Sequence, residues 1–216
     1  MSLRVEQLSL GPIGTNCYLV RRDASSSEAV VVDPSGDATE LRLELARLGA
    51  RCGAILVTHG HWDHLLGVAD LAAGTGAPVY MPDGERESLE HPSASLPPGL
   101  SLHAHVPDVL LHGGEAIEVA GITFDVLPVP GHSLAHVAYY ADGSLFSGDV
   151  LFAGSVGRTD LQGGDWDGLL ASIRSLVDSY PPETVVHPGH GPTTTLGREL
   201  ARNPFLVELR EPAAEP

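Results

Sequence analysis

The stretch LVTHGHWDHLLG, residues 56–67, crowds four potential metal ligands into six positions: His59, His61, Asp63 and His64. The apolar run 54–57 precedes this cluster, and 65–71 follows it with apolar residues that suit a helix. The cluster is therefore predicted to lie where a buried strand ends and a helix begins. In α/β folds such a junction presents side chains at the carboxyl edge of a sheet. Nitrogen and oxygen ligands this closely set indicate a metal site rather than a polar loop.

The composition is that of an ordinary globular protein, with 216 residues, 43% of them hydrophobic and 19% charged. We expect a single domain over residues 1–206 and a disordered tail over 207–216. Cys17 and Cys52 lie within or beside apolar segments, so they are predicted to be small buried residues rather than a disulfide. The sequence shows no signal peptide and no long apolar run, so a cytoplasmic protein without a membrane partner is expected.

The charge balance argues against a nucleic-acid partner. The formal net charge is −16, from 12 basic and 28 acidic residues, and all 12 basic residues are arginines. Binding to nucleic acid rests on neutralisation of phosphates by basic side chains, and the chain has no basic cluster. The absence of lysine also removes that residue as a catalytic base or Schiff-base nucleophile.

Alternating and apolar runs predict two successive halves, each of which ends in a strand, a loop and a helix. The predicted strands are 3–9, 16–22, 29–33, 54–58, 77–80, 115–119, 122–127, 136–140, 144–147 and 184–187. The predicted helices are 37–48, a segment from the histidine cluster to about residue 73, 166–178 and 194–202. Residues 82–104 are rich in Pro, Ser and Gly and predict a long loop of the kind that often serves as a lid.

Three more loops resemble the first one. LPVPGHSLAH places His132 after the strand 122–127, LFSGDVLF places Asp149 after 144–147, and VVHPGHGPT places His190 after 184–187. Each of these residues has a glycine beside it, which allows a tight turn and close approach of another group. Four strand ends can converge on one edge of a sheet sandwich. The combined set of five histidines and two aspartates is large enough for two metal ions.

The string His59-x-His61-x-Asp63-His64, followed in order by His132, Asp149 and His190, resembles the metallo-β-lactamase superfamily. Within it the chain looks like the glyoxalase II-type hydrolases in their short bacterial form, which lacks the helical C-terminal domain that holds glutathione. The resemblance covers roughly residues 3–205, including TNCYLV, VDPSGD, GRTDLQGGD and NPFL. The chain stops soon after NPFL, so a more open pocket is expected. True β-lactamases of the group usually carry Cys at the position of Asp149.

The resemblance implies a four-layer αββα sandwich of two mixed β-sheets, with the site along one edge of both sheets. By position, His59, His61 and His132 would bind a first metal ion. Asp63, His64 and His190 would bind a second, with Asp149 bridging the two. Zinc is the expected metal, with iron and manganese as alternatives that suit the same imidazole and carboxylate ligands.

The implied activity is hydrolysis of a small-molecule thioester, S-lactoylglutathione or a related 2-hydroxyacyl thioester. A hydroxide that bridges the ions would attack the carbonyl, and Asp63 would orient it as a catalytic residue. The alternative is a persulfide dioxygenase of the same fold, with one Fe(II) held by His59, His132 and Asp149. The same ligand residues are compatible with both activities. The sequence does not indicate the oligomeric state.

Two residues near this set have open roles. Arg158 in SVGRTDLQGGD is predicted either to form a buried ion pair with Asp160 or to bind a substrate carboxylate. His136 lies four residues after His132 and is predicted to support the site or to pack, because the ligand set is already full.

Overall fold

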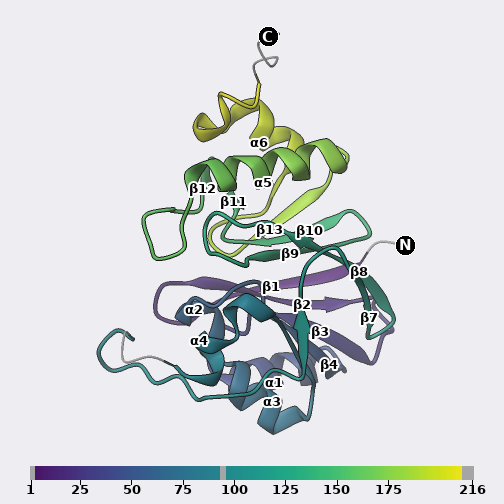
Figure 1. Cartoon of the computed structure of the whole chain (residues 1–216). Helices are drawn as coiled ribbons and strands as arrows, with labels where there is room; N and C mark the ends of the chain where they lie inside the picture. Colours follow the sequence, from purple (N-terminus) through teal and green to yellow (C-terminus); the bar gives the residue numbers. More distant parts are fainter. Residues whose placement is uncertain (1–2, 93–95, 211–216) are drawn as a thin grey trace.

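Two six-stranded mixed sheets face each other, and helices cover the outer face of each sheet (Figure 1). The computed structural model describes residues 3–92 and 96–210. This arrangement confirms the four-layer αββα sandwich that the sequence predicts. Among the described residues, no helix is both long and apolar enough to cross a membrane.

The first sheet has the strand order β1-β2-β3-β4-β5-β6, antiparallel from β1 to β3 and parallel from β3 to β6. Its strands are β1 (Arg4–Leu10), β2 (Thr15–Arg21), β3 (Glu28–Val32), β4 (Arg51–Leu56), β5 (Val79–Pro82) and β6 (Val109–Leu111). The helices packed on its outer face are α1 (Ala38–Arg47) and α3 (Val68–Thr75), and α2 (Trp62–Leu65) lies at its edge.

The second sheet has the order β14-β13-β10-β9-β8-β7, with β10 and β13 parallel and the other neighbours antiparallel. Its strands are β7 (Ala116–Val119), β8 (Ile122–Pro128), β9 (Val137–Ala141), β10 (Ser144–Gly148), β13 (Val185–Pro188) and β14 (Thr194–Thr195). Its outer helices are α5 (Trp166–Ser179) and α6 (Leu196–Arg202). A small hairpin joins β11 (Leu151–Phe152) to β12 (Ser155–Val156).

The central strands of each sheet are buried on both faces, which explains why they read as continuous apolar runs, whereas β8 alternates buried and exposed residues. In β2 the side chain of Tyr18 packs between the sheets, whereas its neighbour Leu19 packs under α1 and α3. On the second sheet Phe146 faces the first sheet, and Leu145 packs under α5. Cys17 and Cys52 are buried free thiols, as the sequence predicts.

The topology brings four strand ends to one edge of the sandwich. β4 ends at Leu56, directly before the histidine cluster, and the parallel strands β10 and β13 end directly before Asp149 and His190. β8 ends at Pro128, and the loop that follows carries His132. The site residues therefore arise from both sheets.

Several predicted elements differ from the structure. The helix expected up to residue 73 is split into α2 and α3 at Gly67, where an added Cβ would lie 2.5 Å from the carbonyl oxygen of Gly36. The predicted loop 82–104 contains a 3-10 turn, η1 (Asp83–Glu85), and a short helix, α4 (Glu87–Glu90). β6 and the β11–β12 hairpin were not predicted, because such short strands carry too little periodicity.

The predicted tail needs a partial correction. Residues 207–210 form turns, in which Arg210 N–H donates to the carbonyl oxygen of Val207 at 3.1 Å. The Arg210 side chain also hydrogen-bonds the backbone carbonyls of Leu200 and Asn203. The remainder of the predicted tail, 211–216, lies outside the described residues.

Candidate metal centre

Three imidazole nitrogens meet at the first half of the centre. His59 Nε2 lies 3.0 Å from His61 Nδ1, and His132 Nε2 lies 2.8 Å from the same nitrogen. The three rings stand nearly perpendicular to one another, at 81° to 90°. In a tetrahedral zinc site, bonds of ~2.0–2.1 Å place neighbouring ligands ~3.3 Å apart. The two spacings to His61 are a few tenths of an ångström shorter than this value, and all three nitrogens lie within 4.8 Å of one another, so a small outward shift would fit them to one ion.

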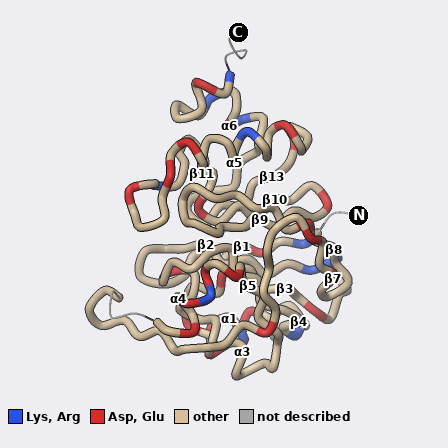
Figure 2. Tube along the Cα trace, in the orientation of Figure 1, with Lys and Arg blue, Asp and Glu red and all other residues tan. Residues whose placement is uncertain are grey.

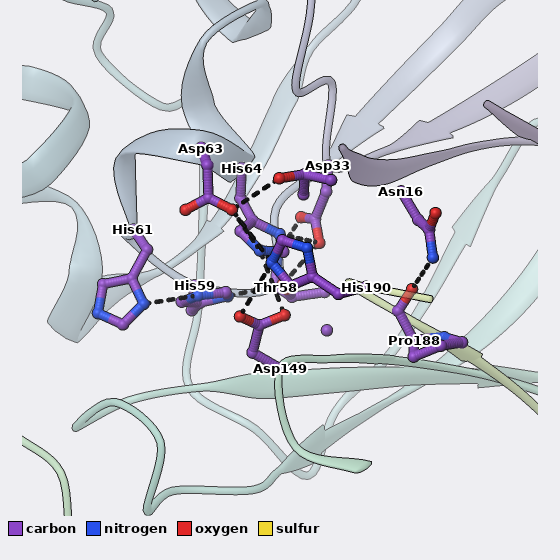
Figure 3. Close-up of polar contacts among 12 residues, drawn as sticks. Asn16, Asp33, Thr58, His59, His61, Asp63, His64, Asp149, Pro188 and His190 are labelled. Carbon is purple, nitrogen blue, oxygen red and sulfur yellow. Dashed lines mark hydrogen bonds and ion pairs between the residues drawn. The ribbon is translucent and has the colours of Figure 1, made fainter. Parts of the chain in front are cut away.

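Asp63, His64 and His190 form the second half. Asp63 Oδ2 lies 3.4 Å from His64 Nε2 and 3.3 Å from His190 Nε2 (Figure 3). Asp63 and His64 come from α2, and His190 comes from the loop after β13. The ligand atoms of each half lie within 4.8 Å of one another.

Asp149 lies between the two halves (Figure 3). Its Oδ2 atom is 3.5 Å from His132 Nε2 of the first half and 3.5 Å from His190 Nε2 of the second. Its Oδ1 atom is 3.4 Å from His64 Nε2. One carboxylate therefore faces ligand atoms of both halves, as a bridging ligand would. All seven residues that the sequence singles out converge here.

Hydrogen bonds outside the centre fix the tautomers of three histidines. Thr58 Oγ1 donates to Asp33 at 2.7 Å, so its 3.0 Å contact with His59 Nδ1 must be donated by the ring. His64 Nδ1 donates to Asp33 Oδ2 at 2.9 Å, and His132 Nδ1 donates to the Arg158 carbonyl at 2.8 Å. In its neutral form each ring then directs a bare Nε2 lone pair into the centre, which is the arrangement that metal-binding histidines require.

Buried atoms without partners show that the centre fits a cation. Among the described residues, His64 Nε2 and Asp149 Oδ1 are buried and accept no hydrogen bond. Buried polar atoms without partners cost free energy, and lone pairs that face each other repel. A positive ion between them would remove both costs. The donor set of imidazoles and carboxylates suits a divalent metal such as zinc, iron or manganese.

The pKa values indicate which charges the centre carries. Burial lowers the pKa of His59 well below its ordinary value, and the nearby His64 adds to that shift, so the His59 ring is uncharged. Burial opposes ionisation of Asp149, but His64 and His190 outweigh burial and hold its pKa well below the usual range. Burial also opposes charge on His64, yet Asp149 and Asp33 raise its pKa well above the usual value. Either a proton on His64 or a metal ion can balance the negative charge of these carboxylates.

Sequence reasoning missed three residues that hold the ligands in place. Asp33 follows β3 with φ at +48° and accepts from the Thr58 backbone N–H at 2.8 Å as well as from His64. Thr15 Oγ1 donates to Asp63 Oδ2 at 2.7 Å. Glu85 accepts from Gly60 N–H at 3.2 Å and Ala135 N–H at 2.9 Å, which joins two ligand loops. The motifs VDPSGD and TNCYLV contain Asp33 and Thr15, but only the fold shows what they contact.

His136 supports the centre from behind. Its ring stacks on His59 with centroids 4.5 Å apart, and its Nε2 accepts from the Asp149 backbone N–H at 3.1 Å. Burial lowers the pKa of His136 well below the usual value, so the ring is neutral. This confirms its predicted supporting role.

Arg158 forms the predicted ion pair with Asp160, but the pair is exposed rather than buried. Arg158 Nε and Nη2 each lie 2.7 Å from an oxygen of Asp160, and both side chains are largely exposed. The expectation of a buried pair is wrong because these residues lie in the loop after β12, on the rim of a cavity. That cavity has a volume of about 1020 Å³ and opens over His61, Asp63, His132, Asp149 and His190.

The fold and this site define a known class of protein. The chain belongs to the metallo-β-lactamase superfamily, whose family model matches residues 10–193. It is 32% identical to the probable metallo-hydrolase YqgX of Bacillus subtilis, over 94% of this chain and 98% of the relative. It is also 32% identical to the hydroxyacylglutathione hydrolase GloC of Haemophilus influenzae, with the same two coverages.

Solved structures share the fold closely. The BLEG-1 B3 metallo-β-lactamase is 43% identical with a TM-score of 0.89, over 94% of this chain and 100% of that one. TTHA1623 in a di-iron-bound form is 40% identical with a TM-score of 0.81, over 93% and 100%. ETHE1 from Myxococcus xanthus is 26% identical with a TM-score of 0.75, over 100% and 92%.

Proposed function

We propose that this metallo-hydrolase cleaves thioesters at a centre of two divalent metal ions. The observation that carries the proposal is the position of Asp149, whose Oδ2 atom is 3.5 Å from a histidine nitrogen of each half. A single-ion site would need only one half. The complete second half, with its own carboxylate Asp63, supports two ions.

In this proposal three residues would hold each ion, and Asp149 would be shared between the two sets. The first set is His59, His61 and His132, and the second set is Asp63, His64 and His190. Zinc is the metal that we propose, and the di-iron form of TTHA1623 supports iron as the alternative. When bound, the ions would supply Lewis acidity to the thioester carbonyl and lower the pKa of water to near neutrality.

The chain's own residues set the charge and orientation at the reacting carbonyl. Two carboxylates, Asp63 and Asp149, balance about half of the charge of two divalent ions. The centre thus keeps a net positive charge that favours the negative charge developing on the carbonyl oxygen. Thr15 holds Asp63 Oδ2 by a 2.7 Å hydrogen bond, so this carboxylate is oriented at the floor of the cavity, where it can accept a proton from the attacking water.

The substrate that we propose is S-lactoylglutathione or a related 2-hydroxyacyl thioester. The similarity to GloC over nearly the whole of both chains supports this class, and the open cavity above the centre has room for such a molecule. The alternative is oxidation of a persulfide at one Fe(II) held by His59, His132 and Asp149. These three residues lie together in the centre, although an oxidation of this kind would leave the second half without a role.

Replacement of Asp63 by Asn tests the proposal. The variant keeps the shape of the side chain and loses its charge. We expect thiol release from S-lactoylglutathione to fall by on the order of 10²–10³, as for other groups that organise the attacking and developing charges. Metal content should fall from two ions towards one. The matched control is Asp167→Asn, at an exposed position on α5. Thiol release at the wild-type rate by Asp63→Asn would remove Asp63 from the mechanism.

A further inference from the structure

Large apolar side chains line the outer part of the cavity above the metal centre. They come from the β1–β2 turn, α2, the β11–β12 hairpin and two loops: Ile13, Trp62, Leu134, Phe152, Val156 and Leu161. We call these six residues the apolar wall. Ile13, Leu134 and Leu161 are 55%, 73% and 40% exposed, although such side chains are normally buried. Their clustering beside a reactive centre indicates a binding surface rather than scattered exposure.

The loops that present this wall have a defined shape. Asp165 N–H donates to the Gly131 carbonyl at 2.7 Å, which ties the loop after β12 to the loop that carries Leu134. A Cβ added at Gly163 would lie 3.4 Å from Leu134 Cβ, so the two loops are in contact. Gly164 N–H donates to the Leu161 carbonyl at 2.9 Å and closes the turn. A preformed wall costs less conformational entropy when a ligand binds.

The charges around the cavity do not favour an anionic group away from the metal centre. Arg158 is the single Arg that lines the cavity in the described part of the chain, and Asp160 already pairs with it through two hydrogen bonds. Glu85, which also lines the cavity, adds a negative charge. Figure 2 shows acidic positions spread along the trace and fewer basic ones, in line with the net charge of −16.

We propose that the apolar wall binds an uncharged alkyl or aryl group of the thioester, so that kcat/KM rises with the length of that group. This proposal rests on the thioester hydrolysis proposed above, and it narrows the substrate class. The cavity volume of about 1020 Å³ leaves room for a group of several carbons beside the reacting carbonyl. The chemistry of the wall is the same whether that group belongs to the acyl side or to the thiol side.

Two substrate series distinguish the two sides. The first series varies the acyl chain from acetyl to hexanoyl on the neutral thiol N-acetylcysteamine. The second series keeps the acetyl group and lengthens an alkyl thiol by the same steps. Burial of one methylene contributes about 0.8 kcal/mol, or about 4-fold. For a partly exposed wall we expect kcat/KM to rise about 2- to 4-fold per methylene in one series, and less in the other.

Variants of the wall test whether it causes this rise. The double variant Leu134→Ala/Leu161→Ala removes two exposed side chains and should keep the fold. It should flatten the dependence of kcat/KM on chain length, so that the hexanoyl thioester loses far more of its kcat/KM than the acetyl thioester does. The matched control is Leu43→Ala, on the outer helix α1, where the leucine is 67% exposed and lies outside the cavity. This control should keep the wild-type dependence.

Fluorescence of Trp62 provides a measurement that does not need catalysis. The chain has two tryptophans, so Trp166→Phe leaves Trp62 of the wall as the only indole. The probes are the S-hexyl and S-methyl thioethers of N-acetylcysteamine, which have no thioester bond to hydrolyse. The S-hexyl probe should shift the Trp62 emission and bind at least about 10-fold more tightly than the S-methyl probe. Addition of Leu134→Ala/Leu161→Ala should remove most of that difference.

The outcomes separate this proposal from the proposed function. Hydrolysis of acetyl thioesters without any gain with chain length would overturn the wall and leave the thioester hydrolase intact. If no thioester releases thiol, the proposed function is wrong. The Trp62 fluorescence then tests by itself whether the apolar wall binds an alkyl group. Equal binding of the two thioethers would then overturn it, and tighter binding of the S-hexyl thioether would support it.

Discussion

Replacement of Gly189 by Ala should displace the carboxylate of Asp149, although the substitution changes none of the seven candidate metal ligands. A Cβ at this position would lie 2.1 Å from Asp149 Oδ1 and 2.7 Å from His64 Cε1. Ordinary contacts of a Cβ begin at 3.4 Å, so the Asp149 oxygen would have to move by about 1.3 Å. The backbone cannot yield instead, because Gly189 N–H donates to Gly148 at 2.8 Å and its carbonyl accepts from Asn16 at 2.7 Å.

A movement of that size exceeds what a metal site tolerates, since ligand distances vary by only about ±0.2 Å. Damage to outer partners of metal ligands costs about 10- to 100-fold in affinity, so we expect a loss on the order of 10²-fold here. The assay is competition for Zn²⁺ with a chromophoric chelator, together with metal analysis after dialysis. Urea unfolding of the metal-free proteins reports the stability cost separately, which should be about 1–3 kcal/mol for overpacking.

Gly191→Ala is the control for this experiment. Gly191 has φ at +77°, and an added Cβ would meet nothing within 4 Å. The substitution costs roughly 1 kcal/mol of backbone strain and leaves Asp149 in place. It should lower stability and keep metal affinity. Binding of both ions by Gly189→Ala with wild-type affinity would refute the bridging position of Asp149.

Two further variants probe groups around the centre. Glu85→Gln would turn one of two acceptors into a donor that faces a backbone N–H, at Gly60 or Ala135, and should cost about 1–3 kcal/mol in urea unfolding. The exposed Glu87→Gln is the control, and equal stability of the two variants would contradict this role. Burial lowers the pKa of His187 to about 4 from 6.5, so this side chain should contribute a loss of about 3 kcal/mol in the free energy of unfolding as pH falls from 6.5 to 4, because only the unfolded chain takes up that proton. His187→Phe should remove this part of the pH dependence. If the free energy of unfolding falls equally with pH in wild type and in His187→Phe, His187 does not cause the loss.

The sequence predicted the ligand set because metal chemistry restricts both residue type and position. Imidazole and carboxylate groups each followed an apolar strand, and strand ends of this kind meet at one edge of a sheet sandwich. The central strands were recognisable as apolar runs because both of their faces are buried, and β8 was recognisable because its residues alternate. Tyr18 and Leu19 face opposite layers, yet both are apolar.

The supporting residues could not be predicted because their effect depends on contacts between distant segments. Asp33 holds His64 across 31 positions of sequence, and Glu85 joins Gly60 to Ala135 across 25 and 50 positions. Nothing in residue type or spacing separates these carboxylates from the other acidic residues of an acidic chain. The exposure of the Arg158–Asp160 pair likewise depends on where the loop after β12 lies.

Stepwise addition of Zn²⁺ to metal-free protein, under anaerobic conditions, tests the two-ion thioester hydrolase most directly. Thiol release from S-lactoylglutathione and from acetyl-N-acetylcysteamine would be followed after each addition. The expected result is activity that rises until about two equivalents of Zn²⁺ are bound and then stays constant, because both halves of the centre contribute to the reaction. Full activity at one equivalent would contradict the two-ion centre. A protein that is inert with Zn²⁺, and that consumes O₂ with glutathione persulfide when loaded with Fe(II), would contradict the hydrolase.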